Sequence, residues 1–298
     1  MSSESSARLR ATLERTVLAA AIVALVLWVA LGRINAVQHI SIGVAGAGLA
    51  AYLAWRVEAG RWWAAYILGF VAFVYLRALA DDTALAWRYE YAIDLDELLG
   101  AGSVPSTWLQ ARWYEAGASG LHDWLLFAVY GSYFFVPQLA AILIWRFRRP
   151  RLPRFVVAML LTFAAGLLGA YLLPTAPPWL AAEDGYLSGV RRIALDLVFG
   201  GLGGIQETGT VLARSNAAAA MPSVHMAVTA VLVLAVWRER RALAVGGALY
   251  AGAMALALIY LGEHYAVDVL AGIAVALAAW LASERLIERV NARSTTEE

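Results

Sequence analysis

Long apolar runs, each of the length that a helix needs to cross a bilayer, recur along the whole chain. Such a helix takes about 20 residues, and runs of suitable length occur about eight times. They lie at 16–32, 34–55, 62–80, 122–145, 155–174, 222–237, 242–262 and 265–282. Hydrophobic residues make up 62% of the 298 residues and charged residues only 15%, which is too few for the surface of a soluble protein of this size. We therefore predict an all-α fold, a polytopic membrane helix bundle with about eight transmembrane helices.

Two of these runs carry signals that bear on how they cross the membrane. Pro137 lies inside the fourth run and predicts a kink there. The first run follows basic residues, as the apolar part of a signal peptide does, but no A-x-A cleavage site comes after it. We interpret it as a helix that is retained.

The remaining segments complete a predicted domain plan. Residues 1–61 hold an N-terminal tail and two helices, 62–283 form a catalytic membrane core of six helices, and 284–298 form a cytoplasmic tail, with both chain ends disordered. Trp and Tyr residues favour the membrane surface. They predict a short interfacial helix within 103–117, and an apolar stretch predicts another within 185–201.

The distribution of Arg predicts the orientation of the bundle. Basic residues concentrate in short loops on the cytoplasmic side of membrane proteins. An even number of helices puts both termini on one side, and that side collects most of the 23 basic residues, including the cluster RFRRPRLPR at 146–154. The long connections 81–121 and 175–221 fall on the other side with most of the acidic residues. We predict an integral membrane protein, of a bacterial plasma membrane, whose long connections are extracytoplasmic.

Composition excludes several classes of function. A net charge of +1 without a basic domain gives no support for a nucleic-acid partner. The chain has neither Cys nor Lys, which excludes disulfides, zinc–thiolate sites and Schiff-base chemistry. GGLGGI at 200–205 lacks the spacing of a dinucleotide fingerprint. We therefore expect no cofactor and no metal, while the sequence leaves the oligomeric state open.

Two histidines and a carboxylate are predicted to meet at the extracytoplasmic edge. His225 stands in the first turn of the sixth run, and His264 comes just before the eighth, on the same side of the membrane. Asp268 follows His264 by four residues, which is about one helical turn. An imidazole held by a carboxylate can attack phosphorus, and a second, protonated imidazole can supply a proton to the leaving oxygen. The set therefore indicates phosphoryl transfer, although one interfacial His alone is more often a simple polar anchor.

Other polar groups near this edge are candidates for holding a phosphate. Ser223 and the amides at a helix start can bind phosphate oxygens, and Arg191 or Arg192 can add positive charge. A structural role for these Arg residues is the competing interpretation. Asp268 at a helix start could also simply complement the helix dipole, but ionisable groups within apolar segments are usually functional.

Five short segments resemble motifs of the type 2 phosphatidic acid phosphatase superfamily. They are MPSVH (221–225), HYAVD (264–268), LLPTAPPWL (172–180), VPSTWLQ (104–110) and YGSYFFVP (130–137). The first two resemble the superfamily's second and third signature motifs. The set is most similar to the bacterial inositolphosphotransferase, or inositol phosphorylceramide synthase-like, branch, and it covers residues 75–282 or so.

The resemblance implies a role for individual residues. His264 would be the nucleophile that forms a phosphohistidine, and Asp268 would orient it. His225 would be the acid for the leaving group and then the base for the acceptor, while Ser223 would help to hold the phosphate. Enzymes of this superfamily need no metal and work on lipid phosphates or phospholipids at the outer edge of the membrane.

Departures from the superfamily pattern favour the synthase-like branch. Ala257 and Leu258 replace the Ser-Arg of the third motif, Val224 replaces the Gly of the second, and the first motif lacks its Lys. The phosphate therefore needs other cations. We consider Arg192, Arg191, Arg77 and Arg214, with Tyr265 as a further phosphate contact and with Asp81, Asp82 and Arg77 as acceptor-side candidates.

Three functions remain open at this point. The first is an integral-membrane lipid phosphotransferase that moves inositol phosphate or a related head group through a phosphohistidine. The second is a lipid phosphate phosphatase, which differs only in using water as the acceptor. The third is a non-enzymatic transporter or lipid-binding protein with a relic site, supported only by the missing motif residues.

Overall fold

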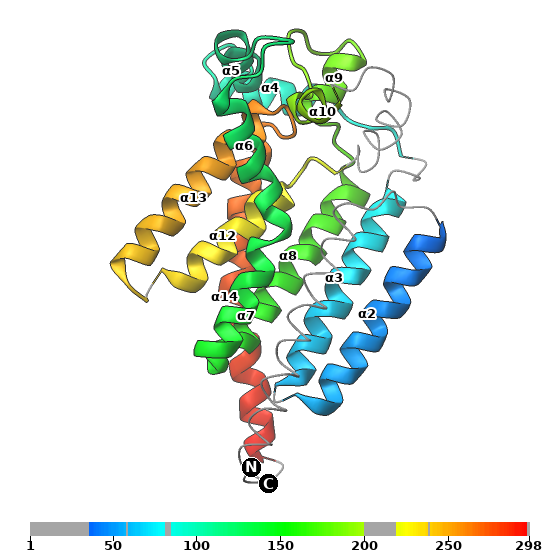
Figure 1. Ribbon diagram of the computed structural model, residues 1–298, viewed down its shortest axis with the longest axis vertical. Coiled ribbons are helices and arrows are strands. Elements are labelled where there is room, and N and C mark those ends of the chain that lie inside the picture. Colours follow the sequence, from blue (N-terminus) through cyan, green and yellow to red (C-terminus); the bar gives the residue numbers. More distant parts are fainter. Residues whose placement is uncertain (1–35, 58, 81–84, 200–218, 238, 297–298) are drawn as a thin grey trace, which may run out of the picture.

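A computed structural model describes residues 36–57, 59–80, 85–199, 219–237 and 239–296 of the chain. Its described part consists of helices, loops and two isolated β-bridges. The first predicted run, at 16–32, lies outside the described residues. The long helices are α2 (Ala36–Arg56), α3 (Gly60–Ala80), α6 (Leu121–Gly131), α7 (Val136–Phe147), α8 (Leu152–Leu172), α12 (Val224–Val236), α13 (Arg241–Tyr260) and α14 (Ala266–Thr296). They form a bundle, and a layer of shorter helices covers one end of it (Figure 1).

Three described helices are long and apolar enough to cross a membrane. They are Arg149–Leu172, Arg241–Tyr260 and Ala266–Arg289, and the bent pair of α6 and α7 makes a fourth if it counts as one span. α12 is apolar but has only 13 residues. The chain is thus an all-helical integral membrane protein, while the number of eight spans stays a prediction.

The break between α6 and α7 agrees with the kink predicted from Pro137. α6 ends at Gly131, a 3-10 turn covers Ser132–Phe134, and α7 starts at Val136 with Pro137 in its first turn. The two helices meet at an angle of 50°. Proline is tolerated in a first turn because its missing N–H has no helical acceptor there.

Short helices build the layer at the end of the bundle. They are α4 (Glu90–Leu99), α5 (Pro105–Trp113), α9 (Pro178–Glu183) and α10 (Ile193–Phe199) (Figure 1). α5 confirms the helix predicted within 103–117, and α10 covers only the second half of the one predicted within 185–201. The sequence analysis did not anticipate α4 and α9.

α14 corrects the prediction for the C-terminal tail. The helix continues to Thr296 instead of ending near residue 282, and it includes most of the segment 292–298, which was predicted to be disordered. The stretch SERLIERVNAR contains three Arg and two Glu, which are good helix formers.

α12 is the central helix around which the site forms. It packs against α8, α13 and α14, and all of its residues from Val224 to Leu232 are buried. Its apolar character therefore reflects contact with other helices more than contact with lipid. The helix begins at Val224, two residues after Pro222, with Ser223 as its N-cap.

Candidate active site

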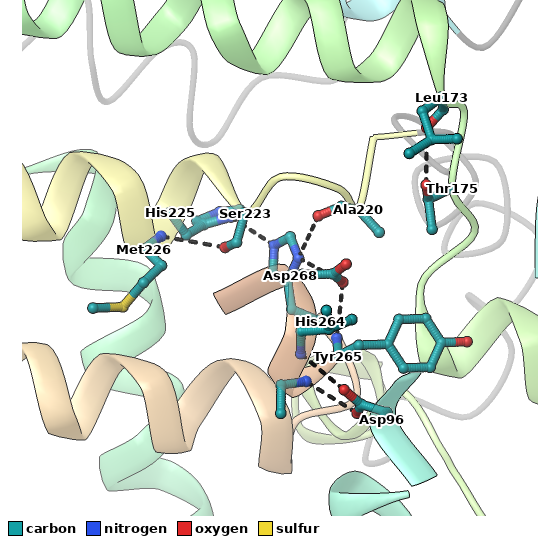
Figure 2. Close-up of polar contacts among 12 residues, drawn as sticks. Asp96, Leu173, Thr175, Ala220, Ser223, His225, Met226, His264, Tyr265 and Asp268 are labelled. Atoms are coloured by element: carbon teal, nitrogen blue, oxygen red, sulfur yellow. Dashed lines mark hydrogen bonds and ion pairs between the residues drawn. The ribbon is translucent and has the colours of Figure 1, made fainter. Parts of the chain in front are cut away.

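The two predicted histidines are in direct contact. Nδ1 of His225 lies 3.2 Å from Nε2 of His264, and both side chains are buried, with 6% and 3% of their surface exposed (Figure 2). His225 projects from the start of α12, and His264 lies on the turn that enters α14. Residues 39 positions apart thus meet at one point, at the end of the bundle that carries the short helices.

The hydrogen bonds of this pair fix where its protons lie. Nδ1 of His264 is 3.0 Å from the carbonyl oxygen of Ala220, which can only accept, so this nitrogen carries the proton. Nε2 of neutral His264 then presents a lone pair, to which Nδ1–H of His225 donates. The nitrogen with the nucleophilic lone pair therefore faces the second imidazole.

Asp268 lies behind His264. Its Oδ2 is 3.5 Å from Nδ1 of His264 and accepts the backbone N–H of Tyr265 at 2.8 Å. The carboxylate is fully buried, and its Oδ1 makes no hydrogen bond to any described residue. A carboxylate at this place can orient the imidazole that it faces.

Ala220 is a site residue that the sequence analysis missed. Its carbonyl is held in place because its own N–H donates to the carbonyl of Thr175, at 3.1 Å. Thr175 forms one isolated parallel β-bridge with Arg88 and another with Ala219. The sequence could not indicate this role, because a run of four Ala residues has no polar side chain and the group that accepts the hydrogen bond from His264 is a backbone carbonyl.

Close helix contact places the start of α12 against α14. Ser223 caps α12 by accepting the N–H of Met226 at 3.2 Å, and its own N–H donates to the carbonyl of Asp268 at 3.1 Å. Gly272 permits this approach, because a Cβ at that position would lie 2.4 Å from the carbonyl oxygen of Ser223. The Ser223 hydroxyl therefore already serves as a helix cap, and its proton remains available to a ligand.

Two tyrosines flank His225. The ring centroids of Tyr133 and Tyr130 lie 4.2 and 5.2 Å from that of His225. Both belong to the segment YGSYFFVP, which the sequence analysis singled out without giving it a role. They form an aromatic wall that limits the movement of the imidazole.

Arg77 and Arg192 are the cations that stand near this wall. The charge of Arg77 acts on His225, Tyr130 and Tyr133, and that of Arg192 acts on Tyr130. Nε of Arg77 is buried and has no hydrogen-bond partner among the described residues.

Arg192 is held from two sides. Its guanidinium donates to both carboxylate oxygens of Glu263, at 2.8 and 3.2 Å, and lies over the ring of Trp179 at 4.4 Å. Glu263 directly precedes His264, so the ion pair stands next to the histidines.

Other predicted site residues are not brought to the histidines. Arg191 is half-exposed and pairs with Asp196 at 2.8 Å. The ring of Tyr265 packs in an apolar cluster with Ala92 and Val104. Asp81, Asp82 and Arg214 lie outside the described residues. In the described part of the chain, no three carboxylate or imidazole groups gather as metal ligands would.

Comparison with known proteins assigns the chain to a family. The model of the PAP2 superfamily matches residues 93–282, which include both histidines and Asp268. The chain belongs to the PAP2 superfamily. No solved structure matches it.

One curated relative of this PAP2 chain is named phosphoinositol dihydroceramide synthase, from Bacteroides thetaiotaomicron. The two are 32% identical over 180 residues, which is 54% of this chain and 57% of the relative. The chain thus matches a little over half the length of that protein. The match supports the resemblance to the synthase-like branch of the superfamily.

One PAP2 motif position at which this chain departs from the superfamily lies in the last turn of α13, before His264. Leu258 stands where the superfamily has Arg, and it is fully buried. Its backbone carbonyl accepts the N–H groups of both Glu263 and His264, each at 3.1 Å. The position therefore shapes the turn that carries His264, and any positive charge for a phosphate comes from elsewhere.

Proposed function

We propose that this PAP2 enzyme transfers phosphoinositol, or a related phosphorylated head group, from a phospholipid to a lipid alcohol through a phosphohistidine on His264. The observation that carries the proposal is the 3.2 Å contact between the two buried imidazoles, backed by Asp268. The printed name of the curated relative supports the choice of phosphoinositol and of a dihydroceramide-like acceptor.

In the first step, Nε2 of His264 attacks the phosphorus of the donor lipid. The bond from phosphorus to the diacylglycerol oxygen breaks, and protonated His225 gives its proton to that oxygen. Asp268 and the Ala220 carbonyl hold the Nδ1–H and stabilise the positive charge that develops on the ring. A gap of 3.2 Å cannot hold a phosphorus atom between the two nitrogens, so substrate binding has to separate the rings.

In the second step, the acceptor hydroxyl attacks the phosphohistidine. His225, now neutral, takes the hydroxyl proton, the phosphorus–nitrogen bond breaks, and His264 returns to its neutral form. Diacylglycerol and the phosphoinositol lipid are the products. Water in place of the alcohol would give free inositol phosphate.

Arg77 and Arg192 are assigned to the phosphate oxygens. Charge-assisted hydrogen bonds from guanidinium groups stabilise the negative charge of a transferring phosphoryl group. Arg192 is fixed by Glu263 and Trp179, and the unbonded Nε of Arg77 is available to an oxygen. Ser223 contributes its hydroxyl proton. We do not assign Arg191 or Tyr265 to the phosphate, because their contacts lie elsewhere.

Replacement of the nucleophile tests the mechanism. Purified protein with radiolabelled phosphatidylinositol and dihydroceramide should form a phosphorylated lipid product and an acid-labile label on the protein. His264→Ala should lose both, because Nε2 of His264 is the atom that attacks phosphorus in this mechanism. His122→Ala is the matched control, since His122 is half-exposed and bonds to the carbonyl of Trp113. Full activity of His264→Ala would show that the mechanism is wrong.

The identity of the phosphorus product separates transfer from hydrolysis. The assay is run with and without the lipid alcohol, and the products are analysed by mass spectrometry. Transfer predicts a new phosphoinositol lipid only when the alcohol is present. Inositol phosphate as the only product under both conditions would contradict the transferase and support the phosphatase.

A further inference from the structure

Asp96, a residue of the covering layer, reaches the turn that carries the catalytic histidine. It lies on α4 and is fully buried. Its Oδ2 accepts the N–H of Ala266 at 3.0 Å, and its Oδ1 accepts the N–H of Val267 at 2.8 Å (Figure 2). These are the first two residues of α14, and they follow directly after His264 and Tyr265. A side chain 170 residues away in sequence therefore caps this helix.

Asp96 and Asp268 accept the N–H groups at the start of α14 and just before it. The first N–H groups of a helix have no partner within the helix and need outside acceptors. Asp96 satisfies those of Ala266 and Val267, and Asp268 takes only that of Tyr265. Oδ2 of Asp268, which accepts that N–H, is also the oxygen that lies 3.5 Å from Nδ1 of His264, while Oδ1 makes no hydrogen bond to a described residue.

Asp96 stabilises the start of α14 as a cap, but it does so with a carboxylate whose burial carries a cost. Burial raises the pKa of Asp96 to about 6, in spite of its two hydrogen bonds, and the charge of Asp268 adds to the effect. Tyr265 stands beside both carboxylates. A local Ser, Thr or Asn would cap the helix without burying a second negative charge. Buried ionisable groups with a shifted pKa, such as Asp96, are typical of functional sites, which keep a required geometry at some cost in stability.

We propose that Asp96 is a positioning residue for the nucleophile, which acts by holding the first turn of α14 so that Asp268 stays in register with His264. Its role in catalysis rests on the proposed function, in which His264 attacks phosphorus. Loss of this hold allows the turn to move, and Nδ1 of His264 then shifts relative to both the Ala220 carbonyl and Asp268, which together keep its proton in place.

Asp96→Asn is the first test, with Asp94→Asn as its matched control. Asn has the same size but only one acceptor oxygen, so one of the two N–H groups loses its partner. We expect kcat to fall about 10- to 100-fold, the range for groups that orient a catalytic ligand, with little change in KM. Asp94 is exposed on the same helix, and its replacement should leave kcat unchanged.

Ala266→Pro is a second variant, which leaves the Asp96 carboxylate in place. Proline is tolerated at the first position of a helix and has no N–H, so one of the two hydrogen bonds is removed from the other side. We expect a smaller loss of kcat in the same direction. Thermal melting shows whether each variant is folded.

Nitrogen NMR of the histidine rings gives a measurement that needs no substrate. The chain has only four His residues, so labelled histidine gives few ring signals, and His264→Ala identifies those of His264. Wild type and Asp94→Asn should show the Nδ1–H form of His264, and Asp96→Asn should show a mixture of both tautomers. Wild-type turnover in Asp96→Asn, or reduced turnover with unchanged His264 signals, would overturn the proposal. If wild type has no activity on any lipid, the proposed function fails, and the ring signals still decide the role of Asp96.

Discussion

At the scale of single residues, the proposed site takes its cations from arginines outside the motifs. His225, His264 and Asp268 are visible in the sequence because each belongs to a short motif, MPSVH or HYAVD, that can be recognised locally. Arg77 and Arg192 could be named only as candidates, because their place depends on how α3 and the 175–221 connection fold over the site. The structure separates them from Arg191, whose guanidinium pairs with Asp196.

Arg77→Ala should reduce kcat/KM by roughly 10- to 150-fold. A hydrogen bond to a charged group contributes about 1.5–3 kcal/mol, and loss of the Arg77 guanidinium removes one such bond from the phosphate. The measurement is steady-state transfer from phosphatidylinositol. Arg61→Ala is the control, because Arg61 lies at the other end of α3, is exposed and contacts Trp62. Equal activity of the two variants would remove Arg77 from the phosphate site.

At the scale of helices, the active site depends on how closely α12 approaches α14. The apolar pattern predicted most helix positions, since it follows from burial and from the length of each run. It could not predict that α12 is short and surrounded by protein, because a helix that faces lipid and one that faces other helices are equally apolar. α4 and its Asp96 were missed for a related reason, because a contact across 170 residues leaves no local pattern.

Gly272→Ala should weaken both the fold and the activity. An added Cβ would lie 2.4 Å from the carbonyl oxygen of Ser223, so α12 has to move away from α14 and the two histidines have to separate. Overpacking of this kind costs about 1–3 kcal/mol. Gly252→Ala is the control, since a Cβ there meets nothing within 4 Å. Thermal melting and the transfer assay should both distinguish the two variants, and a fully active Gly272→Ala would show that the close contact is not needed.

At the scale of the whole molecule, the site lies at the end of the bundle that the long connections cover. α4, α5, α9 and α10 form the layer at this end, while the loop between α12 and α13 lies away from it, at the side of the bundle (Figure 1). Arg148 and Arg151 of the basic cluster pair with Glu239 of that loop. Basic residues thus gather away from the histidines, and the positive-inside rule predicts that this region is cytoplasmic.

Single cysteines should reveal this orientation directly, because the natural chain has none. Glu115 is exposed in the covering layer, and Arg240 is exposed in the loop between α12 and α13. A membrane-impermeant maleimide should label Glu115→Cys in intact cells, since the layer with the active site faces outward. It should label Arg240→Cys only after the membrane is permeabilised. The reverse pattern would place the active site on the cytoplasmic side, and the lipid alcohol would then have to be supplied from the inner leaflet.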